Sequence, residues 1–579
     1  MFSLSIINEE FEVKGDFKFH NKRIRLVQKY KLKYWDPYYC DKNNVQIIIL
    51  GRPVLDLFEW SDCVYNEVSF VSKKLLGYYL STNSISDFCN KLNGGFIIVV
   101  IDYKKDRMII VRDRLGIYPG YVCNIEKEND FLFSTHSDIL AKYTGNNELD
   151  TTSIAEFIEQ GSVSHPYTFY SNIKSMDNAS YIELNYPKNI TFNNSYFSFE
   201  KINKIKGKVE AFNGLRSAIK NSIERRSHKF LGKSGVLLSG GGDSRVIVSN
   251  SLTQLKAFTV YHNKNYELGI TKEITKKTKI EHLLIRLSSS SNIKSLQESS
   301  KFTGGMVSGG SASWYSLIDK SNLFDVDNLL TGDYADWLLK DIAFNTEKVR
   351  LFGRQIPLNR FSKYKDSFYA PFVKISGLNS KTENRKNNKY KDIKNNLTKL
   401  QVRRIIPLSN EYTSSSRLIL QRFFPWDTIF SDNEIIDIVF SLSPKFKLNS
   451  VLYNKVLGDL CHDLSKINHA NKRVPLNSSI FYSTFIQSMN ILYSKFFRNS
   501  NSSVDILDGR IEYIINNKEI MNMFYNIPSE VKNILIDICG IDIFNLSLDE
   551  LANYDNHLPV HVISFSNWYH SVYTSQIDV

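Results

Sequence analysis

A turn of three successive glycines is the part of this chain best suited to chemistry. The apolar run Val236-Leu237-Leu238 predicts a buried parallel strand, and Ser239-Gly240-Gly241-Gly242-Asp243-Ser244 and the apolar spacing of a helix follow it. Glycines let a backbone approach a ligand closely, and the helix aims free N–H groups and its positive dipole end at an anion. The carboxylate of Asp243 beside that anion supplies oxygen to a bridging Mg²⁺. The pattern therefore indicates a site for a pyrophosphate group.

A glycine-rich turn without a ligand is the structural alternative for this segment. A second candidate phosphate loop, Gly232-Lys233-Ser234, mimics the end of a Walker A motif, but Ser227 stands where that motif needs its first glycine. The triplet also precedes its strand instead of following it, so we set it aside.

The length and the net charge of the chain limit the classes of protein to which it can belong. A chain of 579 residues with 42% hydrophobic residues predicts two or more domains with large cores. The net charge of +13 suggests nucleic acid as a partner. However, the lysines are spread along the chain, with no basic stripe interleaved with aromatic residues and no zinc-finger spacing. We therefore expect a solvated basic surface and no nucleic-acid partner.

The cysteines and the apolar runs indicate the compartment. The six cysteines are scattered without a C-x-x-C pair, which argues against disulfides or a zinc site and fits a reducing environment. The first ten residues lack a signal peptide, and apolar runs such as Phe96–Ile101 are too short to cross a bilayer. We expect a soluble, cytoplasmic protein that does not bind membranes. The cysteines are Cys40, Cys63, Cys89, Cys123, Cys461 and Cys539.

The first 195 residues read as short strands separated by turns, with a few helices. We expect a mostly antiparallel β domain here, with Asn93-Gly94-Gly95 and Lys104-Lys105-Asp106 as turns at hairpin spacing. The expected strands are Val45–Leu50, Phe96–Ile101, Met108–Val111, Phe131–Phe133 and Tyr181–Leu184, and the expected helices are Lys73–Thr82, Ser137–Tyr143 and Ile154–Gln160.

From about Lys208 helices alternate with strands, which predicts a doubly wound parallel sheet whose ligand lies beyond the carboxyl ends of the strands. Residues 375–400, rich in Lys and Asn, are expected to form an exposed loop. Helical periodicity dominates after about 410, with a polar break at Arg498–Ser503. The alternation comprises helix 208–226, strand 235–238, helix 244–253, strand 256–261, helix 266–279 and strand 282–287.

The glycine turn resembles the loop of the N-type ATP pyrophosphatases, and three further segments resemble the asparagine synthetase family. Leu92–Phe96 with Val111–Pro119 is similar to the glutaminase-type N-terminal domain of these synthetases, which shows Leu-Asn-Gly-x-Phe and then Arg-Asp-x-x-Gly-x-x-Pro. Leu330–Asp336 resembles their second signature, Ser-Gly-Glu-Gly-x-Asp. The segment from Pro425 to Arg473 resembles their Pro-Phe-Leu-Asp helix and the lysine segment beyond it.

This resemblance covers about residues 45–480 and implies an α/β fold in two domains. Residues 1–200 would form a glutaminase-like antiparallel β-sandwich of the N-terminal-nucleophile type. Residues 205–579 would form an ATP-pyrophosphatase-type, doubly wound parallel sheet with extra helices.

Three departures from the family pattern concern the substrates. Glutamine-dependent members expose an N-terminal Cys as nucleophile, whereas Phe2 stands here and the nearest cysteine is Cys40. We therefore predict an N-terminal domain without glutaminase activity, as in β-lactam synthetases and lasso-peptide cyclases. Gln421 replaces a common Glu, and Asp333-Tyr334 replaces Glu-Gly or Tyr-Gly. These changes leave the acceptor substrate open.

The resemblance implies ATP and Mg²⁺ as ligands and assigns roles to individual residues. Asp243 and Asp336 would bind Mg²⁺, and Lys472 would be the cation for the acyl-adenylate phosphate or the tetrahedral intermediate, with Lys466 and Arg473 as alternatives. Asp333 would take a proton from the attacking amine, with Tyr334 as the alternative. The expected nucleotide-binding residues are Leu238, Ser239, Gly240, Gly241, Gly242, Asp243, Ser244, Val260 and Gly332.

The expected activity is an ATP-dependent, AMP-forming amide ligation of a carboxylate with an amine. The substrate would be a peptide or small molecule that the enzyme closes into a ring. Delivery of this substrate by a partner protein is a further possibility that the sequence leaves open. Ammonia-dependent amidation of an amino acid or sugar acid is the first alternative. A tRNA-modifying pyrophosphatase and a non-catalytic ATP-binding protein are the others. The structural alternative for Lys472 is a solvated surface lysine. For Leu238 and Val260 the structural alternative is packing in the core.

Overall fold

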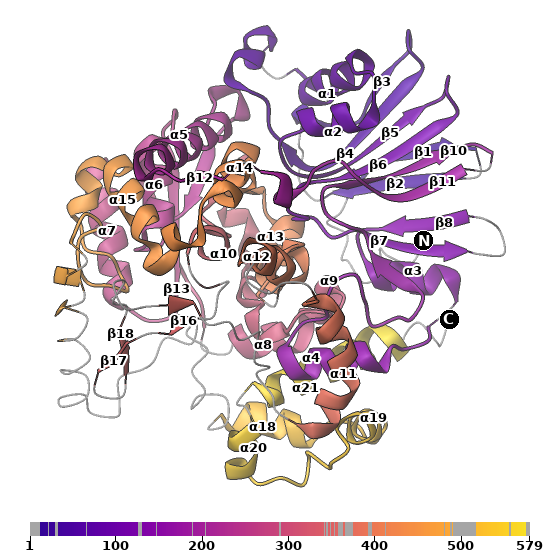
Figure 1. Cartoon of the computed structure of the whole chain (residues 1–579), viewed down its shortest axis with the longest axis vertical. Helices are drawn as coiled ribbons and strands as arrows, with labels where there is room; N and C mark the ends of the chain where they lie inside the picture. The colour runs from indigo at the N-terminus through magenta and orange to yellow at the C-terminus, as the bar shows by residue number, and fades with distance from the viewer. Residues whose placement is uncertain are drawn as a thin grey trace.

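In the computed structural model, the chain folds into two groups of sheets joined by helices (Figure 1). The described residues are 12–20, 22–28, 33–64, 67–125, 130–145, 147–187, 189–202, 204–288, 291–340, 342, 346–347, 349–351, 354–356, 363–364, 375–391, 397–411, 413–479, 481–483, 485–486, 489, 517–554 and 557–574.

The N-terminal region is built on antiparallel sheets. A six-stranded sheet has the order β11-β10-β6-β5-β4-β3, and a three-stranded sheet has the order β8-β7-β9. The strands are β3 (Tyr38–Cys40), β4 (Val45–Pro53), β5 (Gly94–Asp102), β6 (Arg107–Arg112), β7 (Tyr121–Ile125), β8 (Asp130–Ser134), β9 (Ile173–Ser175), β10 (Ser180–Asn185) and β11 (Asn189–Ser195), with a separate hairpin of β1 (Glu12–Phe19) and β2 (Lys22–Gln28).

The six-stranded sheet is covered on both faces, which explains its uninterrupted apolar strands. Every residue of β5 is buried, and successive residues point into two different hydrophobic cores. One core lies under α1 and α2, and the other continues into the C-terminal half (Figure 1). The helices of this region are α1 (Phe70–Ser81), α2 (Ile85–Lys91), α3 (Ser137–Thr144) and α4 (Thr151–Gln160).

A five-stranded parallel sheet forms the centre of the C-terminal half. Its order is β14-β13-β12-β15-β20, so the chain runs outward from β12 on one side and then returns to β15 on the other. This reversal places a switch point between β12 and β15, where ligands of such sheets bind. The strands are β12 (Ser234–Leu237), β13 (Lys256–Tyr261), β14 (Glu281–Arg286), β15 (Asn328–Thr331) and β20 (Trp426–Thr428).

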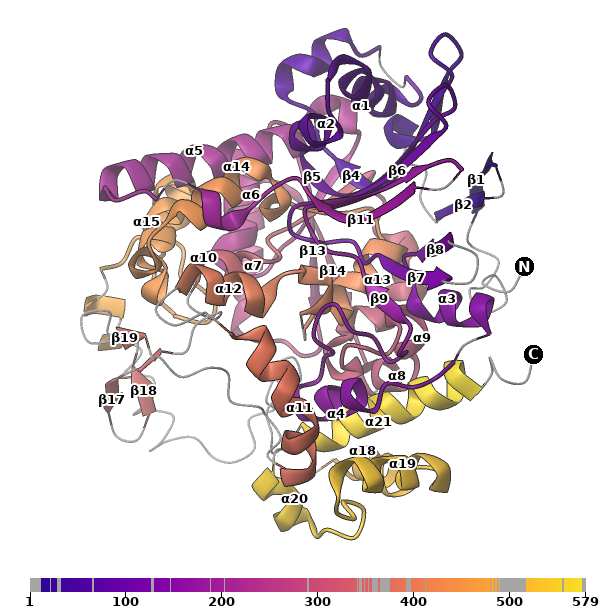
Figure 2. The same cartoon turned by 45° about the vertical axis from the view of Figure 1, so that its right-hand side comes forward.

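Helices surround this sheet and extend to the N-terminal region. The last helices pack with α4 and α11 in the lower part of Figure 2, and they share a hydrophobic core with β7, α3 and α4. The helices are α5 (Lys208–Arg226), α6 (Gly242–Asn250), α7 (Tyr266–Thr278), α8 (Ser291–Glu298), α9 (Ser300–Thr303), α10 (Ala335–Leu339), α11 (Ser376–Lys389), α12 (Leu397–Ile405), α13 (Ser415–Phe423), α14 (Asn433–Ser441), α15 (Val451–Leu460), α18 (Lys518–Tyr525), α19 (Ser529–Cys539), α20 (Leu548–Tyr554) and α21 (Leu558–Trp568). Short strands β16 (Thr346–Glu347), β17 (Val349–Leu351), β18 (Arg354–Ile356) and β19 (Lys363–Tyr364) form two hairpin-like pairs.

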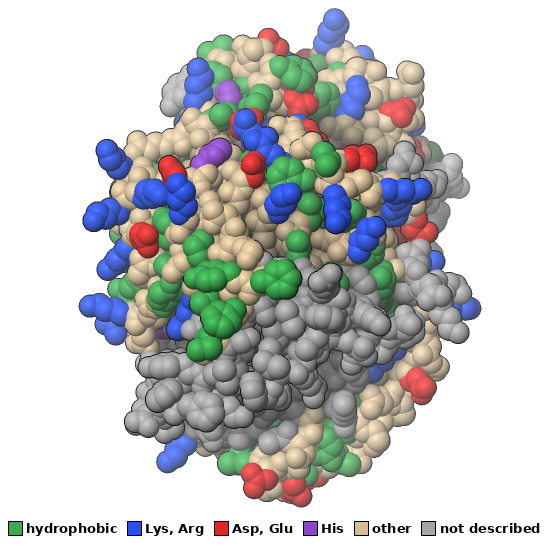
Figure 3. Space-filling view, turned by 60° about the vertical axis from the view of Figure 1, so that its left-hand side comes forward, with side chains coloured by type: hydrophobic (Ala, Val, Ile, Leu, Met, Phe, Trp, Pro, Cys, Tyr) green, Lys and Arg blue, Asp and Glu red, His purple; other side chains and the backbone are tan. Residues whose placement is uncertain are grey.

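The structure confirms the α/β fold class, with antiparallel sheets first and a parallel sheet afterwards. Lys and Arg side chains on the face in Figure 3 are scattered among other residues. No helix among the described residues is long and apolar enough to span a bilayer.

Two local predictions are wrong. Residues 376–389 form α11 instead of an exposed loop, because Leu378 and Thr382 are buried and Arg385 and Lys386 pair with acidic groups at α4. Gly94 and Gly95 belong to β5 and pair with β4, so they make no hairpin turn; α1 and α2 connect these two strands. The polar break at Arg498–Ser503 lies outside the described residues.

Candidate active site

The glycine bend lies at the switch point of the parallel sheet, between β12 and α6. Gly241 is the N-cap of α6, and no side chain caps this helix, so its first N–H groups face the bend. Ser244 holds the bend by accepting a hydrogen bond from the Ser239 amide (3.1 Å) and donating to the Ser239 carbonyl (3.0 Å). This geometry suits a phosphate-binding loop.

The glycines serve close packing rather than unusual backbone angles. Gly240, Gly241 and Gly242 do not have positive φ, so the bend does not use the backbone angles that favour glycine. A Cβ on Gly240 would lie 2.6 Å from the Cβ of Ala470, and one on Gly242 would lie 2.6 Å from Cδ1 of Leu457. Glycine is needed at these two positions because Ala470 and Leu457 pack closely against the bend.

The second signature packs directly against the first. A Cβ on Gly332, just after β15, would lie 2.5 Å from the Cβ of Asp243. Asp336 follows Gly332 in the chain and lies in the first turn of α10. The fold therefore brings the two predicted metal ligands to one place.

Lys340, which the sequence interpretation overlooked, joins these two carboxylates. Its Nζ lies 2.9 Å from Oδ2 of Asp243 and also pairs with Oδ1 of Asp336. Burial disfavours its charged form, but the two carboxylates outweigh this effect and raise the pKa of Lys340. The hydroxyl of Tyr453 donates to the other oxygen of Asp243 (2.7 Å).

This arrangement tests whether the residues fit Mg²⁺. Two carboxylates that reach one ammonium converge on a single cation, and carboxylate oxygens are suitable ligands for Mg²⁺. The donor set therefore fits the metal, with the Lys340 ammonium standing in for it.

A loop that follows α15 covers the glycine bend and carries Lys472. The amide of Ala470 donates to the carbonyl of Gly240 (3.0 Å). Arg245, fully buried, donates to the same carbonyl (3.1 Å) and to the carbonyl of Asn468 (3.0 Å). Arg245 thus ties this loop to the bend, a role that its sequence position did not reveal.

The surroundings of His469 place Lys472 beside the bend. Burial, and after it the nearby charges of Lys472 and Lys340, lower the pKa of His469 to about 3. The ring Nδ1 of His469 accepts hydrogen bonds from the amides of Asn471 (3.1 Å) and Lys472 (3.4 Å). By contrast, Lys466 is exposed and pairs with Asp463, away from this cluster.

Asp333 and Tyr334 lie in a separate cluster next to the bend. Asp333 accepts a hydrogen bond from the indole of Trp426 (3.1 Å), and its other oxygen lies 3.6 Å from Nε of Arg417. The Arg417 guanidinium stacks over the ring of Tyr334 at 4.7 Å. Burial raises the pKa of Tyr334, and its buried hydroxyl has no hydrogen-bond partner in the described structure.

Leu238 and Val260, two of the expected nucleotide-binding residues, differ in exposure. Leu238 is buried in the core and its amide donates to the carbonyl of Phe258 (2.8 Å), whereas Val260 is half-buried at the end of β13. Two residues further on, both ring nitrogens of His262 are buried without a partner in the described structure. His262 is a polar group at the strand end that sequence reasoning missed.

Residues from the N-terminal region reach toward the synthetase half. Gln421, which replaces the family's Glu, donates to the carbonyl of Ile117 (3.0 Å), so it links the two halves. Arg112 donates to the carbonyls of Tyr118 and Gly116, whereas Asp113 accepts from the amides of Leu115 and Ile117. Arg112 and Asp113 thus each bind the backbone of the segment from Leu115 to Tyr118.

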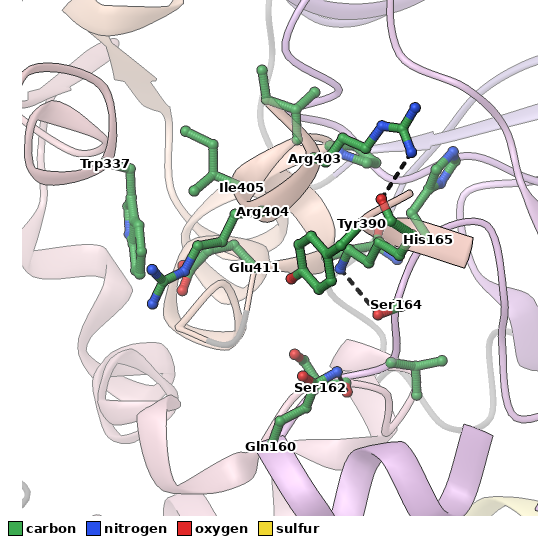
Figure 4. Close-up of a pocket in the computed structure, with 15 residues that line it drawn as sticks. Gln160, Ser162, Ser164, His165, Trp337, Tyr390, Arg403, Arg404, Ile405 and Glu411 are labelled. Carbon is green, nitrogen blue, oxygen red and sulfur yellow. Dashed lines mark hydrogen bonds between the residues drawn. The ribbon is translucent and has the colours of Figure 1, made fainter. Parts of the chain in front are cut away.

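A pocket lies at the seam between the two halves (Figure 4). Gln160 to His165, which end α4 and follow it, form one wall, and residues 403–407 and 410–411 form another. Trp337 of α10 and Lys389 and Tyr390 at the end of α11 complete the lining.

Known proteins match both halves in the expected order. The family model for a glutamine amidotransferase domain matches residues 76–197, and the model for asparagine synthase matches residues 214–421. The chain belongs to the asparagine synthetase family. Asparagine synthetase [glutamine-hydrolyzing] 2 of Bacillus subtilis (strain 168) is 26% identical over 195 residues, which cover 31% of this chain and 25% of that protein. The match thus spans about a quarter of the relative's length.

The family's amidotransferase domain raises the question of a thiol nucleophile. Phe2 lies outside the described residues. Among the cysteines, Cys40 is half-buried, and burial raises the pKa of Cys63 to about 11 and that of Cys461 to about 12. The thiols of Cys63 and Cys461 therefore stay protonated near neutral pH and are poor nucleophiles.

Proposed function

We propose that the protein is an ATP-dependent carbon–nitrogen ligase that activates a carboxylate as its adenylate and joins it to an amine. The observation that carries this proposal is the meeting of Asp243 with Gly332 and Asp336, which brings both synthetase signatures to the uncapped start of α6. Fold alone would not suffice, because one fold hosts many activities.

The first step transfers AMP. An oxygen of the substrate carboxylate attacks the α-phosphorus of ATP, and the bond to the β-phosphate breaks, releasing pyrophosphate. The N–H groups at the start of α6 hold the negative charge that develops on this leaving group. Asp243 and Asp336 would hold Mg²⁺, which neutralises phosphate charge when bound.

The second step forms the amide. The amine nitrogen attacks the activated carbonyl carbon, AMP leaves with the bonding electron pair, and the amine loses a proton. Asp333 is the proposed acceptor of this proton, because it lies in the second signature with its carboxylate oriented by Trp426. Tyr334 is less suited, since burial raises the pKa of its hydroxyl. Lys472, beside the bend, is the proposed cation for the adenylate phosphate.

The amine would come from the substrate itself or from free ammonia rather than from glutamine. The thiols of Cys63 and Cys461 support this proposal, because burial raises their pKa values and makes them poor nucleophiles. Closure of a ring within a peptide or small molecule is the first candidate reaction, and amidation of an amino acid or sugar acid by ammonia is the second.

Product analysis tests the function. The purified protein is incubated with ATP, Mg²⁺ and panels of carboxylic acids and amines, and we expect AMP and pyrophosphate to form in equal amounts only with a suitable acid. Release of ADP and phosphate would contradict an adenylating ligase. A shift of bulk tRNA in a gel would favour a tRNA-modifying enzyme, and failure to bind Mg-ATP in calorimetry would favour a non-catalytic protein.

A further inference from the structure

The pocket at the seam carries more positive charge than its contacts neutralise. Arg403 donates to the carbonyl of Lys389 (2.8 Å), and Nζ of Lys389 donates to the hydroxyl of Ser164 (3.0 Å), as drawn in Figure 4. Both acceptors are uncharged. Within the described part of the chain, no carboxylate lies within ion-pair distance of either cation.

Among the lining residues that the structure describes, the one carboxylate, Glu411, already has partners. Glu411 accepts hydrogen bonds from Nη1 of Arg417 (3.2 Å) and from the amide of Thr413 (3.0 Å). Burial raises the pKa of Glu411, and Arg417 opposes this effect. The pocket is therefore prepared for an anion rather than for a cation.

The motif that resembles the glutaminase domain holds a backbone segment next to one wall of this pocket. The amide of Leu408 donates to the carbonyl of Leu115 (2.9 Å), and the amide of Ser409 donates to the carbonyl of Gly116 (3.0 Å). Arg112, fully buried, donates to the hydroxyl of Ser409 (2.7 Å). These contacts fix the segment between Arg403 and Glu411 against the N-terminal region.

The pocket is linked to the proposed reaction centre by two side chains. Arg417 contacts Glu411 of the pocket and also Asp333, the proposed proton acceptor. Trp337 lines the pocket and follows Asp336 directly in α10. A ligand in the pocket would thus lie one layer of side chains from the second signature.

We propose that this pocket binds an anionic group of the substrate, a carboxylate or a phosphate remote from the reacting carboxylate, and that the N-terminal half serves as its wall. The pocket encloses about 50 Å³. One water molecule needs a cavity volume of about 10–15 Å³, so this volume holds a few water molecules. A space of that size suits a single anionic group. The inference rests on the ligase function proposed above, because that function supplies the substrate.

Anion binding without ATP tests the proposal separately from the ligase reaction. Succinate, inorganic phosphate and uncharged succinamide are titrated into the full chain by calorimetry. Succinate or phosphate should bind and succinamide should not, and the stronger of the two anions identifies the kind of group. Arg403→Gln and Lys389→Gln should each weaken binding at least about tenfold, because each removes a charge-assisted contact.

A lysine on the same helix supplies the matched control. Lys381→Gln removes one charge from α11 outside the pocket and should leave anion affinity unchanged. Far-ultraviolet circular dichroism checks that all variants fold. Absence of anion binding, equal binding of succinamide, or binding that survives both pocket substitutions would overturn the proposal. Loss of adenylation with intact anion binding would instead refute the ligase function alone.

Discussion

The ammonium of Lys340 lies 2.9 Å from Oδ2 of Asp243 and at the same time pairs with Asp336. A protein cation thus occupies the point where the two predicted metal ligands converge. A Mg²⁺ ion would lie about 2.1 Å from its oxygen ligands, so it cannot bind between Asp243 and Asp336 while the Lys340 ammonium is hydrogen-bonded there. Metal binding therefore requires Lys340 to leave the carboxylates.

This competition predicts the behaviour of Lys340→Met. The variant leaves two carboxylates without their cation, so it should melt at a lower temperature than the wild type in a chelating buffer. Added Mn²⁺ should restore the melting temperature and bind without nucleotide, as measured by electron paramagnetic resonance. Lys466→Met, which removes an exposed lysine paired with Asp463, is the control and should change neither. Equal affinity of wild type and Lys340→Met for Mn²⁺ would contradict competition.

Asp243→Ala should remove adenylation. The substitution takes away a ligand for the cation at the start of α6, and loss of one such contact costs roughly 3–4 kcal/mol of transition-state stabilisation. ATP–pyrophosphate exchange with an active acid should fall about 100- to 1,000-fold. The exposed acid Asp463 supplies a control, since Asp463→Ala removes a carboxylate of the surface pair with Lys466. Exchange near the wild-type rate in Asp243→Ala would refute the assignment.

Gly332→Ala should disturb the site through packing alone. The new methyl group would lie 2.5 Å from the Cβ of Asp243, so either β15 or the start of α6 must shift. Such overpacking costs about 1–3 kcal/mol of stability and should weaken nucleotide binding in calorimetry. Gly77→Ala in α1 meets nothing within 4 Å and should leave binding unchanged while stabilising the helix by up to about 1 kcal/mol. Equal nucleotide affinity in both variants would show that the contact is unimportant.

Glutamine should not be a nitrogen donor. Incubation with glutamine should produce no glutamate above the rate without protein, because burial keeps the thiols of Cys63 and Cys461 protonated. The comparison is run with and without ATP. Glutamate that forms in proportion to protein would contradict the prediction.

Lys447 should make the stability depend on pH. Burial lowers its pKa to about 7, so between pH 7 and its usual value near 10.5 the unfolded chain binds the proton that the folded chain lacks. Stability from this residue therefore rises with pH across that window, by up to about 1.4 kcal/mol per pH unit. Lys447→Met should remove this slope in denaturant unfolding at pH 6.5 and pH 9. An identical slope in both proteins would contradict the buried, neutral lysine.

Local patterns in the sequence predicted the parts of the site that depend on neighbouring residues. The bend from Ser239 to Ser244 lies between a strand and a helix as expected, because three glycines and an apolar run suffice to specify such a turn. Likewise, the alternation of helices and strands after Lys208 predicted the parallel sheet. The helix α11 escaped prediction because its stability depends on partners at α4, which lie more than 200 residues away.

By itself, then, the sequence determined the fold class, the family and the position of the phosphate-binding bend, since each rests on contiguous residues. Only the tertiary structure decided that Lys340 lies between Asp243 and Asp336, that Arg245 holds the loop of Lys472 against the bend, and that Arg112 binds Ser409 beside the basic pocket. Lys340 and Asp243 are 97 positions apart, and no local pattern encodes a contact over that distance. It forms because the parallel sheet aligns the ends of β12 and β15.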